Sequence, residues 1–301
     1  MEEASDAVFT VPFFVCLRRE RVFGPDDSGW MVILLAIRKW ATAKADIAQP
    51  LYWTLAAAAF LLLFVIWSFL TYGGYVPPLF LPAPDAIIKA AVLLFSEFDL
   101  TQDIIASVVR VTAGFLLAAA IGVPLGIMMG SLKIFEAFFE PFLGFIRYMP
   151  ASAFIPLFIL WLGIGETEKI AVIFFGTFFQ MTLMVMDVTK NVSQELIDTS
   201  YTLGVSKRSV FWRIILPASL PGIMDTMRIT FGWAWTYLVV AEIVAASSGL
   251  GYMIMQSQRF LKTAHIIVGI FVIGVIGIMI DLLFKWLYGR LFPWMGKGGA
   301  A

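Results

Sequence analysis

The chain has 301 residues, of which 60% are hydrophobic and 14% are charged, and its 21 basic and 21 acidic side chains give a formal net charge of zero. Its mean hydropathy of +0.90 is too high for a soluble domain, because so few polar side chains cannot cover an apolar core in water. The balanced charge argues against a nucleic-acid partner. One cysteine excludes an internal disulfide, and one histidine excludes a histidine-cluster metal site. The composition therefore predicts a membrane protein, which we expect to be all-α and to carry no metal or cofactor in this chain.

Residues 1–50 come before the first apolar segment that is long enough to cross a membrane. A cleavable signal is not expected, because Glu2, Glu3 and Asp6 precede the first apolar stretch, where a signal carries positive charge. Residues 30–40 are apolar but too short to cross, and their two tryptophans and adjoining basic residues suit a helix at the membrane interface. A soluble tail is the alternative. Residues 1–50 are thus predicted to form a cytoplasmic or interfacial segment.

Six segments contain the roughly 20 mostly apolar residues that a helix needs to cross about 30 Å of hydrocarbon. These predicted spans are residues 51–72, 111–130, 148–165, 170–186, 229–247 and 266–284. The first span and an outer segment make up residues 51–107, a core of membrane helices covers 108–290, and a tail covers 291–301. The outer segment, 73–107, opens with prolines and then predicts one polar-faced helix.

The distribution of basic residues predicts how the spans are oriented. With the N-terminus in the cytoplasm, the inner segments hold fourteen lysines and arginines and the outer segments hold four, with three arginines at span ends left uncounted. This asymmetry predicts a multi-pass protein with both termini in the cytoplasm.

Small residues recur at every fourth position of the second predicted span. They are Gly114, Ala118, Gly122, Gly126 and Gly130. Such a stripe lets the backbones of two helices approach closely. Helix packing is therefore the predicted role of these residues, and a role in conduction is the alternative.

About 40 residues separate the fourth and fifth predicted spans, which is more than a simple turn needs. Residues 195–203 alternate acidic, small and apolar side chains at helical spacing, and Gly204 supplies the left-handed position that ends a helix. Ser206 suits the cap of a second helix, which Pro217 and Pro221 are expected to end before the fifth span. A short amphipathic helix here either docks a partner or lies on lipid headgroups.

This loop resembles a cytoplasmic motif of binding-protein-dependent ABC importer permeases: Glu-Ala-Ala, three residues, Gly, nine residues, Ile, any residue, Leu-Pro. At those spacings the chain has Gly204, Ile214, Leu216 and Pro217, with Asp198, Thr199 and Ser200 in place of the triplet. Two further stretches resemble the permeases for nitrate, taurine, alkanesulfonates and bicarbonate. They are RYMPASAFIPLFILWLGIGETEKI from residue 147 and LPASLPGIMDTMRITFGWAWTYLVVAEIVAASSGLGYMI from residue 216. The resemblance runs from about residue 80 to about residue 290.

The resemblance implies a type I ABC importer permease fold with six transmembrane helices and a cytoplasmic coupling helix in loop 189–221. It also implies a second copy of the permease, two cytoplasmic ATP-binding subunits that use ATP and Mg²⁺, and an extracytoplasmic substrate-binding protein, in the inner membrane of a prokaryote. The chain has no G-x-x-x-x-G-K-[ST] phosphate loop, so it is expected to be a transport subunit and not an enzyme. The residues expected to couple to the ATPase are Glu195, Asp198, Thr199, Ser200, Leu203 and Gly204. Ile214, Leu216 and Pro217 are expected to shape the motif.

Three ionisable residues are candidates for the transport pathway. Glu242 falls well inside the fifth span, where a charge is costly unless it is paired, neutralised or wetted. It either lines the pathway or is buried against a polar group or an arginine of another helix. Arg147 and Arg228 lie at cytoplasmic span ends, where they either reach acids or headgroups or attract an anion. The aromatic side chains of the fourth and fifth spans are expected to pack in the bundle and not to line a pathway.

The predicted substrate is a small solute, an anion such as nitrate, bicarbonate or a sulfonate. The alternative is a secondary transporter or channel that works without ATP. That alternative predicts paired acids and bases inside the membrane and an internal repeat, whereas the charged residues within these spans are few and isolated along the sequence.

Overall fold

The computed structural model describes residues 48–295 of the chain. The interfacial helix predicted at 30–40 and the last residues of the predicted tail lie outside the described residues. The chain divides into two compact units, residues 1–66 and residues 67–301. The described part of the first unit is the beginning of α2 (Gln49–Tyr72), and the second unit contains all the other elements.

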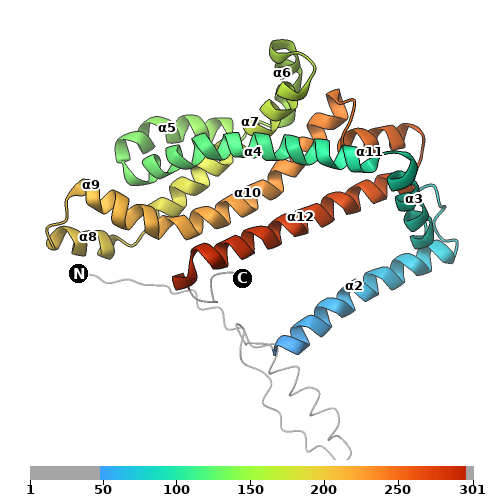
Figure 1. The fold of residues 1–301 in the computed structure, drawn as a ribbon, viewed down its shortest axis with the longest axis horizontal. Helices are drawn as coiled ribbons and strands as arrows, with labels where there is room; N and C mark the ends of the chain where they lie inside the picture. Colours follow the sequence, from blue (N-terminus) through green and yellow to red (C-terminus); the bar gives the residue numbers. More distant parts are fainter. Residues whose placement is uncertain (1–47, 296–301) are drawn as a thin grey trace, which may run out of the picture. The chain divides into compact units, whose positions relative to one another are not determined.

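Every regular element among the described residues is helical, which confirms the predicted all-α class (Figure 1). After α2 follow α3 (Pro84–Glu97), α4 (Leu100–Ser131), α5 (Lys133–Ile146), α6 (Ile155–Leu162), α7 (Glu166–Lys190), α8 (Gln194–Thr202), α9 (Lys207–Val210), α10 (Leu216–Ala245), α11 (Leu250–Arg259) and α12 (Thr263–Leu291). Three short pieces add a 3₁₀ turn at Ala151–Phe154, a π-helical segment at Phe211–Ile215 and a 3₁₀ turn at Pro293–Met295. Within the second unit, α8 and α9 lie at one end of the long helices, and α3 and α11 lie at the other (Figure 1).

Four of the described helices, α2, α4, α7 and α12, are long and apolar enough to cross a membrane. A fifth span results if α5 and the segment Ala151–Leu162 are counted as one bent crossing. α10 has 30 residues and contains the fifth predicted span, but it also carries Asp225, Arg228 and Glu242. The total of six spans therefore stays a prediction.

The third predicted span, 148–165, is helical only from residue 151 to residue 162, and a sharp bend lies at its start. α5 ends at Ile146, and the chain resumes at Ala151 in a direction that differs by 82°. Pro150 lacks a backbone N–H and disfavours a helical conformation in the residue before it, which explains the break. Hydropathy does not reveal this bend, because the apolar run continues through it.

The single helix predicted for the outer segment 73–107 is wrong. α3 ends at Glu97, and α4 begins at Leu100, well before the predicted start of the second span. Between them Asp99 adopts a left-handed backbone conformation with φ of 50°. That conformation interrupts the helical hydrogen bonds and allows the next helix to start in a new direction.

Pro217 and Pro221 do not end a helix, contrary to the prediction. The residues from α9 through the π-helical segment continue into α10 without a break. Pro217 directly follows the π-helical segment, where the regular α-helical hydrogen-bond pattern is already interrupted, and Pro221 lies inside α10. As a result α10 begins at Leu216, earlier than the predicted span at 229–247.

The small residues of α4 lie against α7. A Cβ atom at Gly114 would lie 2.7 Å from Ile173 Cβ, and one at Gly126 would lie 2.6 Å from the Thr182 carbonyl oxygen. Corresponding contacts at Gly122 and Gly130 would be 2.8 Å to Thr182 Oγ1 and 2.5 Å to Thr189 Cβ. No side chain fits at these distances, so the absence of Cβ atoms allows the two backbones to pack closely. This close contact between α4 and α7 fixes the rotation of α7 about its own axis, and so the direction of the side chains on its opposite face.

Candidate functional site

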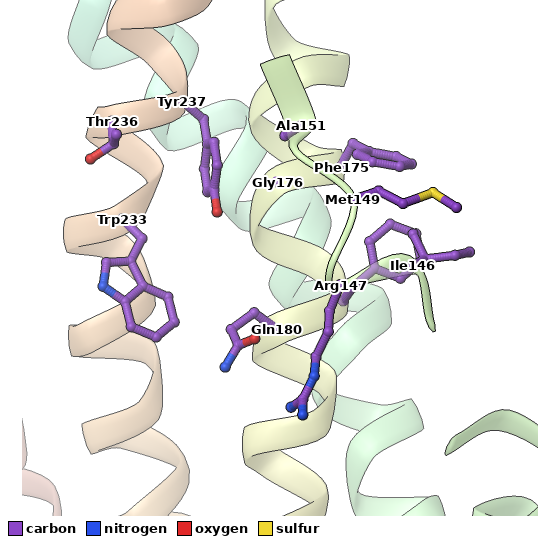
Figure 2. Close-up of a pocket in the computed structure, with 11 residues that line it drawn as sticks. Ile146, Arg147, Met149, Ala151, Phe175, Gly176, Gln180, Trp233, Thr236 and Tyr237 are labelled. Atoms are coloured by element: carbon purple, nitrogen blue, oxygen red, sulfur yellow. The ribbon is translucent and has the colours of Figure 1, made fainter. Parts of the chain in front are cut away.

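A cavity of about 400 Å³ lies between α7, α10 and the connection that follows α5. Its walls include Arg147, Phe175, Phe179, Gln180, Trp233 and Tyr237. Figure 2 shows the Arg147 guanidinium, the Gln180 amide and the rings of Trp233 and Tyr237 directed into the same space. The cavity therefore combines one cation and several hydrogen-bonding groups with aromatic walls.

Arg147 is the charged residue of this cavity, and the break after α5 places it there. It is the C-cap residue of α5, directly before the bend. Its Nη2 donates to the Tyr148 hydroxyl at 3.0 Å, and its guanidinium lies 5.0 Å from the centre of the Tyr148 ring. It forms no ion pair with any residue between 48 and 295. A solvent-accessible guanidinium without a carboxylate partner is free to bind an anion.

The aromatic wall depends on a glycine in α7. A Cβ atom at Gly176 would lie 2.6 Å from Tyr237, so the Tyr237 ring lies against bare backbone. On the same helix the rings of Phe175 and Phe179 meet edge to face, with centroids 4.8 Å apart. These residues and Trp233 line the cavity, so their rings are not covered entirely by neighbouring helices, while their predicted role in packing is not tested by this. Helical periodicity places residues on a face but does not say whether a neighbouring helix covers that face.

A second polar cluster, at the far end of α10 from loop 189–221, surrounds Arg110. Arg110 is 3% exposed and uses all five of its N–H donors. Nε and Nη2 donate to the two Glu166 carboxylate oxygens at 2.5 and 2.7 Å, and Nη1 donates to Glu242 Oε1 at 2.7 Å. The remaining two bonds reach the carbonyl and hydroxyl oxygens of Ser248. Arg110 therefore ties together α4, α7, α10 and the connection between α10 and α11.

Glu242 is fully buried in this cluster and does not line the cavity. Besides Arg110 it accepts hydrogen bonds from the Ser107 hydroxyl at 2.8 Å and from the Gly251 backbone N–H at 2.8 Å. Gly249 has φ of 113°, and a Cβ atom there would lie 2.3 Å from Glu242 Oε1, so this loop position requires glycine. Of the two alternatives for Glu242, the structure has the paired one.

Arg228 lies apart from Arg147. Its guanidinium is 3.5 Å from Asp225 and 3.8 Å from Asp281, and it borders a separate hollow between α10 and α12. Of the three pathway candidates, only Arg147 lines the cavity shown in Figure 2. Arg110 is one of the three span-end arginines that were left uncounted, and it was not a predicted site residue. The signal for this pair was a glutamate inside one predicted span and an arginine at the start of another.

Loop 189–221 forms the helix and glycine turn that its sequence predicts. α8 ends in a Schellman motif: the N–H of Val205 donates to the Ser200 carbonyl at 3.0 Å, and the N–H of Gly204 donates to the Tyr201 carbonyl at 2.9 Å. Gly204 has φ of 77°, and nothing lies within 4 Å of where its Cβ would be. Its requirement for glycine is therefore conformational. The Ser206 hydroxyl caps α9 by accepting from the N–H of Ser209.

The other motif residues lie on the surface or at the helix junction. Glu195, Asp198 and Thr199 are exposed, and Leu203 is 77% exposed, whereas Ser200 is buried and donates to the Leu196 carbonyl. Ile214 lies in the π-helical segment, and Leu216 and Pro217 start α10. An exposed leucine beside exposed carboxylates at the end of a short helix is the composition of a docking surface.

Comparison with known proteins establishes the class of this molecule. Residues 122–297 match the family of binding-protein-dependent transport system inner membrane components, and the chain belongs to this family. It is the permease component of an ABC importer, a transport subunit without a catalytic role.

Among its relatives is the taurine transport system permease protein TauC of Escherichia coli (strain K12), which is 33% identical over 249 residues, covering 81% of this chain and 90% of TauC. The bicarbonate transport system permease protein CmpB of Synechocystis sp. is 27% identical over 266 residues, covering 84% of this chain and 92% of CmpB. Among solved structures, the fold is similar to a chain of the methionine ABC transporter MetNI, with a TM-score of 0.58 and 18% identity, covering 64% of this chain and 96% of that chain. The predicted family and its permease fold are thus confirmed.

Proposed function

We propose that this permease, paired with a second copy, conducts a small oxyanion through the cavity that Arg147 lines. The observation that carries the proposal is an arginine that has no carboxylate partner between residues 48 and 295 and lies beside Gln180, Trp233 and Tyr237. A guanidinium presents a planar pair of donors that matches the oxygens of a sulfonate or carboxylate group. The relatives named above are named for taurine and bicarbonate, and both solutes carry an oxyanion group.

The exposure of Arg147 also fits a transport pathway better than a site that binds its ligand tightly. Conduction requires that a solute bind well enough to enter and weakly enough to leave. A guanidinium that remains in contact with water attracts an anion without holding it as a buried pair would. The aromatic walls supply apolar contact for the rest of an organic anion, and the Gln180 amide and the Tyr237 hydroxyl supply further hydrogen bonds.

The coupling loop is the proposed contact with the ATPase. In each permease copy, a groove on one of the two ATP-binding subunits would accept the exposed side chains of Glu195, Asp198, Thr199 and Leu203. The turn at Gly204 fixes the direction in which α8 projects. Closure of the ATPases on ATP would then shift the permease between its inward-facing and outward-facing states. An extracytoplasmic binding protein would deliver the solute, and both termini would lie in the cytoplasm.

The pathway proposal is tested by Arg147→Gln in proteoliposomes that contain the co-purified importer and its binding protein. We expect uptake of the anionic substrate to fall about tenfold, the loss of one charge-assisted contact, while ATP hydrolysis by the complex continues. Arg259→Gln, which removes an exposed cation outside the cavity, is the matched control and should transport normally. Normal uptake by Arg147→Gln would contradict the proposed pathway.

The coupling proposal is tested by Gly204→Val. A β-branched side chain strains the left-handed turn, so α8 would project wrongly and ATP hydrolysis would no longer respond to substrate. The measurement is a detergent pull-down followed by an ATPase assay. Normal substrate-stimulated hydrolysis would contradict the role of the turn. Recovery of the permease alone, active in liposomes without ATP, would instead support a secondary transporter.

A further inference from the structure

A groove of about 650 Å³ lies where the last turns of α4 meet the π-helical segment and the start of α10. One wall is made by Ile127, Met128 and Leu132, and the other by Phe211, Trp212 and Leu216. α4 is one of the helices long and apolar enough to cross the membrane; Ile127 and Met128 lie near its end, and Leu132 is its C-cap residue. The groove therefore begins at membrane depth and ends where headgroups are expected.

Two cations, Lys207 and Arg208, complete the lining of this groove. Both are exposed, and neither forms a salt bridge or side-chain hydrogen bond with a residue that the structure describes. Their aliphatic stems contribute to the apolar lining while their charged ends stay available. An otherwise apolar hollow with two unneutralised cations at one end is complementary to an amphiphile with an anionic head.

The backbone beside the groove is unusual as well. Phe211 and Trp212 belong to the π-helical segment Phe211–Ile215, whose wider turn separates α9 from α10. Such segments are rare and occur frequently at functional sites. Here the segment lies directly after the coupling loop, so an occupant of the groove would contact the chain between α8 and the long helix α10.

We propose that this groove binds one anionic phospholipid of the leaflet on the side of loop 189–221. An acyl chain lies against the apolar walls, and the phosphate lies between Lys207 and Arg208. The apolar segment at residues 30–40 of the same chain is a poorer occupant, because it carries Arg38 and Lys39 and no acid and would add positive charge to positive charge. The proposal does not depend on the substrate of the importer.

The test is native mass spectrometry of the purified full-length permease with phosphatidylglycerol and with phosphatidylcholine of the same acyl chains. We expect the wild-type chain to bind phosphatidylglycerol about tenfold more tightly than phosphatidylcholine. The double variant Lys207→Gln with Arg208→Gln should lose this preference and keep its binding of phosphatidylcholine. Met128→Trp, which fills the apolar part of the groove, should weaken the binding of both lipids.

Arg213→Gln is the matched control, because Arg213 is an exposed cation of the same π-helical segment that does not line the groove. This variant should retain the preference for phosphatidylglycerol. The proposal is overturned if the wild-type chain does not distinguish the two lipids, if the double variant keeps the preference, or if Arg213→Gln loses it to the same extent. Unchanged binding of both lipids by Met128→Trp would equally place the lipid elsewhere.

Discussion

Arg110 and Arg147 occupy opposite electrostatic situations within one bundle of helices. Arg110 is buried and donates all five of its N–H groups to protein acceptors, whereas Arg147 is exposed and donates to one tyrosine hydroxyl. A guanidinium whose N–H groups are all hydrogen-bonded cannot bind a solute, and removing it would leave a buried carboxylate without its counter-charge. A guanidinium with free N–H groups can bind a solute and contributes little to the stability of the fold. Arginine therefore stabilises the fold at position 110 and, in our proposal, binds the transported anion at position 147.

The largest effect is expected from Arg110→Met. Loss of one partner of a buried ion pair costs about 3–5 kcal/mol of stability, because Glu242 would remain buried without its counter-charge. The measurement is the thermal unfolding midpoint of the purified permease in detergent. In the double variant Arg110→Met with Glu242→Leu, much of this loss should be recovered, since no unpaired charge remains. Additive losses in the double variant would show that the pair itself is not what stabilises this end of the bundle.

A smaller effect is expected from Glu166→Gln, which breaks the outer half of the same cluster. The Glu166 side chain is 61% exposed, so water compensates for a lost partner, and we expect destabilisation of about 1 kcal/mol or less. The thermal midpoint should move far less than in Arg110→Met and should approach that of the wild-type chain at high salt. An effect as large as that of Arg110→Met would show that water does not compensate for the loss of the Glu166 carboxylate.

The smallest effect on stability is expected from Arg147→Gln. The side chain is exposed and has no acidic partner among the described residues, so the change in stability should stay within about 0.5 kcal/mol. The thermal midpoint of this variant, measured beside its transport rate, separates the two roles: uptake should fall while the midpoint stays. A clear drop in the midpoint would remove the contrast with Arg110 and would class Arg147 as a structural residue.

Much of the local structure follows from the sequence. The apolar segments that predict spans lie in helices, and Gly204 ends α8 in a left-handed turn as its position predicts. The errors occur at prolines and at Asp99. Pro150 lies in the bend at the start of a predicted span, whereas Pro217 and Pro221 lie within a continuous run of helix. A proline disfavours helix in the residue before it, but the packing of the surrounding chain decides whether a helix bends, starts or continues there.

The sequence by itself determined that this protein crosses membranes, belongs among ABC importer permeases and carries a helix and glycine turn between its fourth and fifth predicted spans. These properties depend on apolar length, turn chemistry and residue spacing, which are local. Only the tertiary structure decided which charged side chains pair with one another and which remain unpaired. The acceptors of Arg110 lie 56, 132 and 138 residues away along the chain, and the cavity at Arg147 exists because α5 ends at a bend. Such contacts depend on how each helix is rotated and packed against its neighbours, and neither hydropathy nor spacing specifies that rotation.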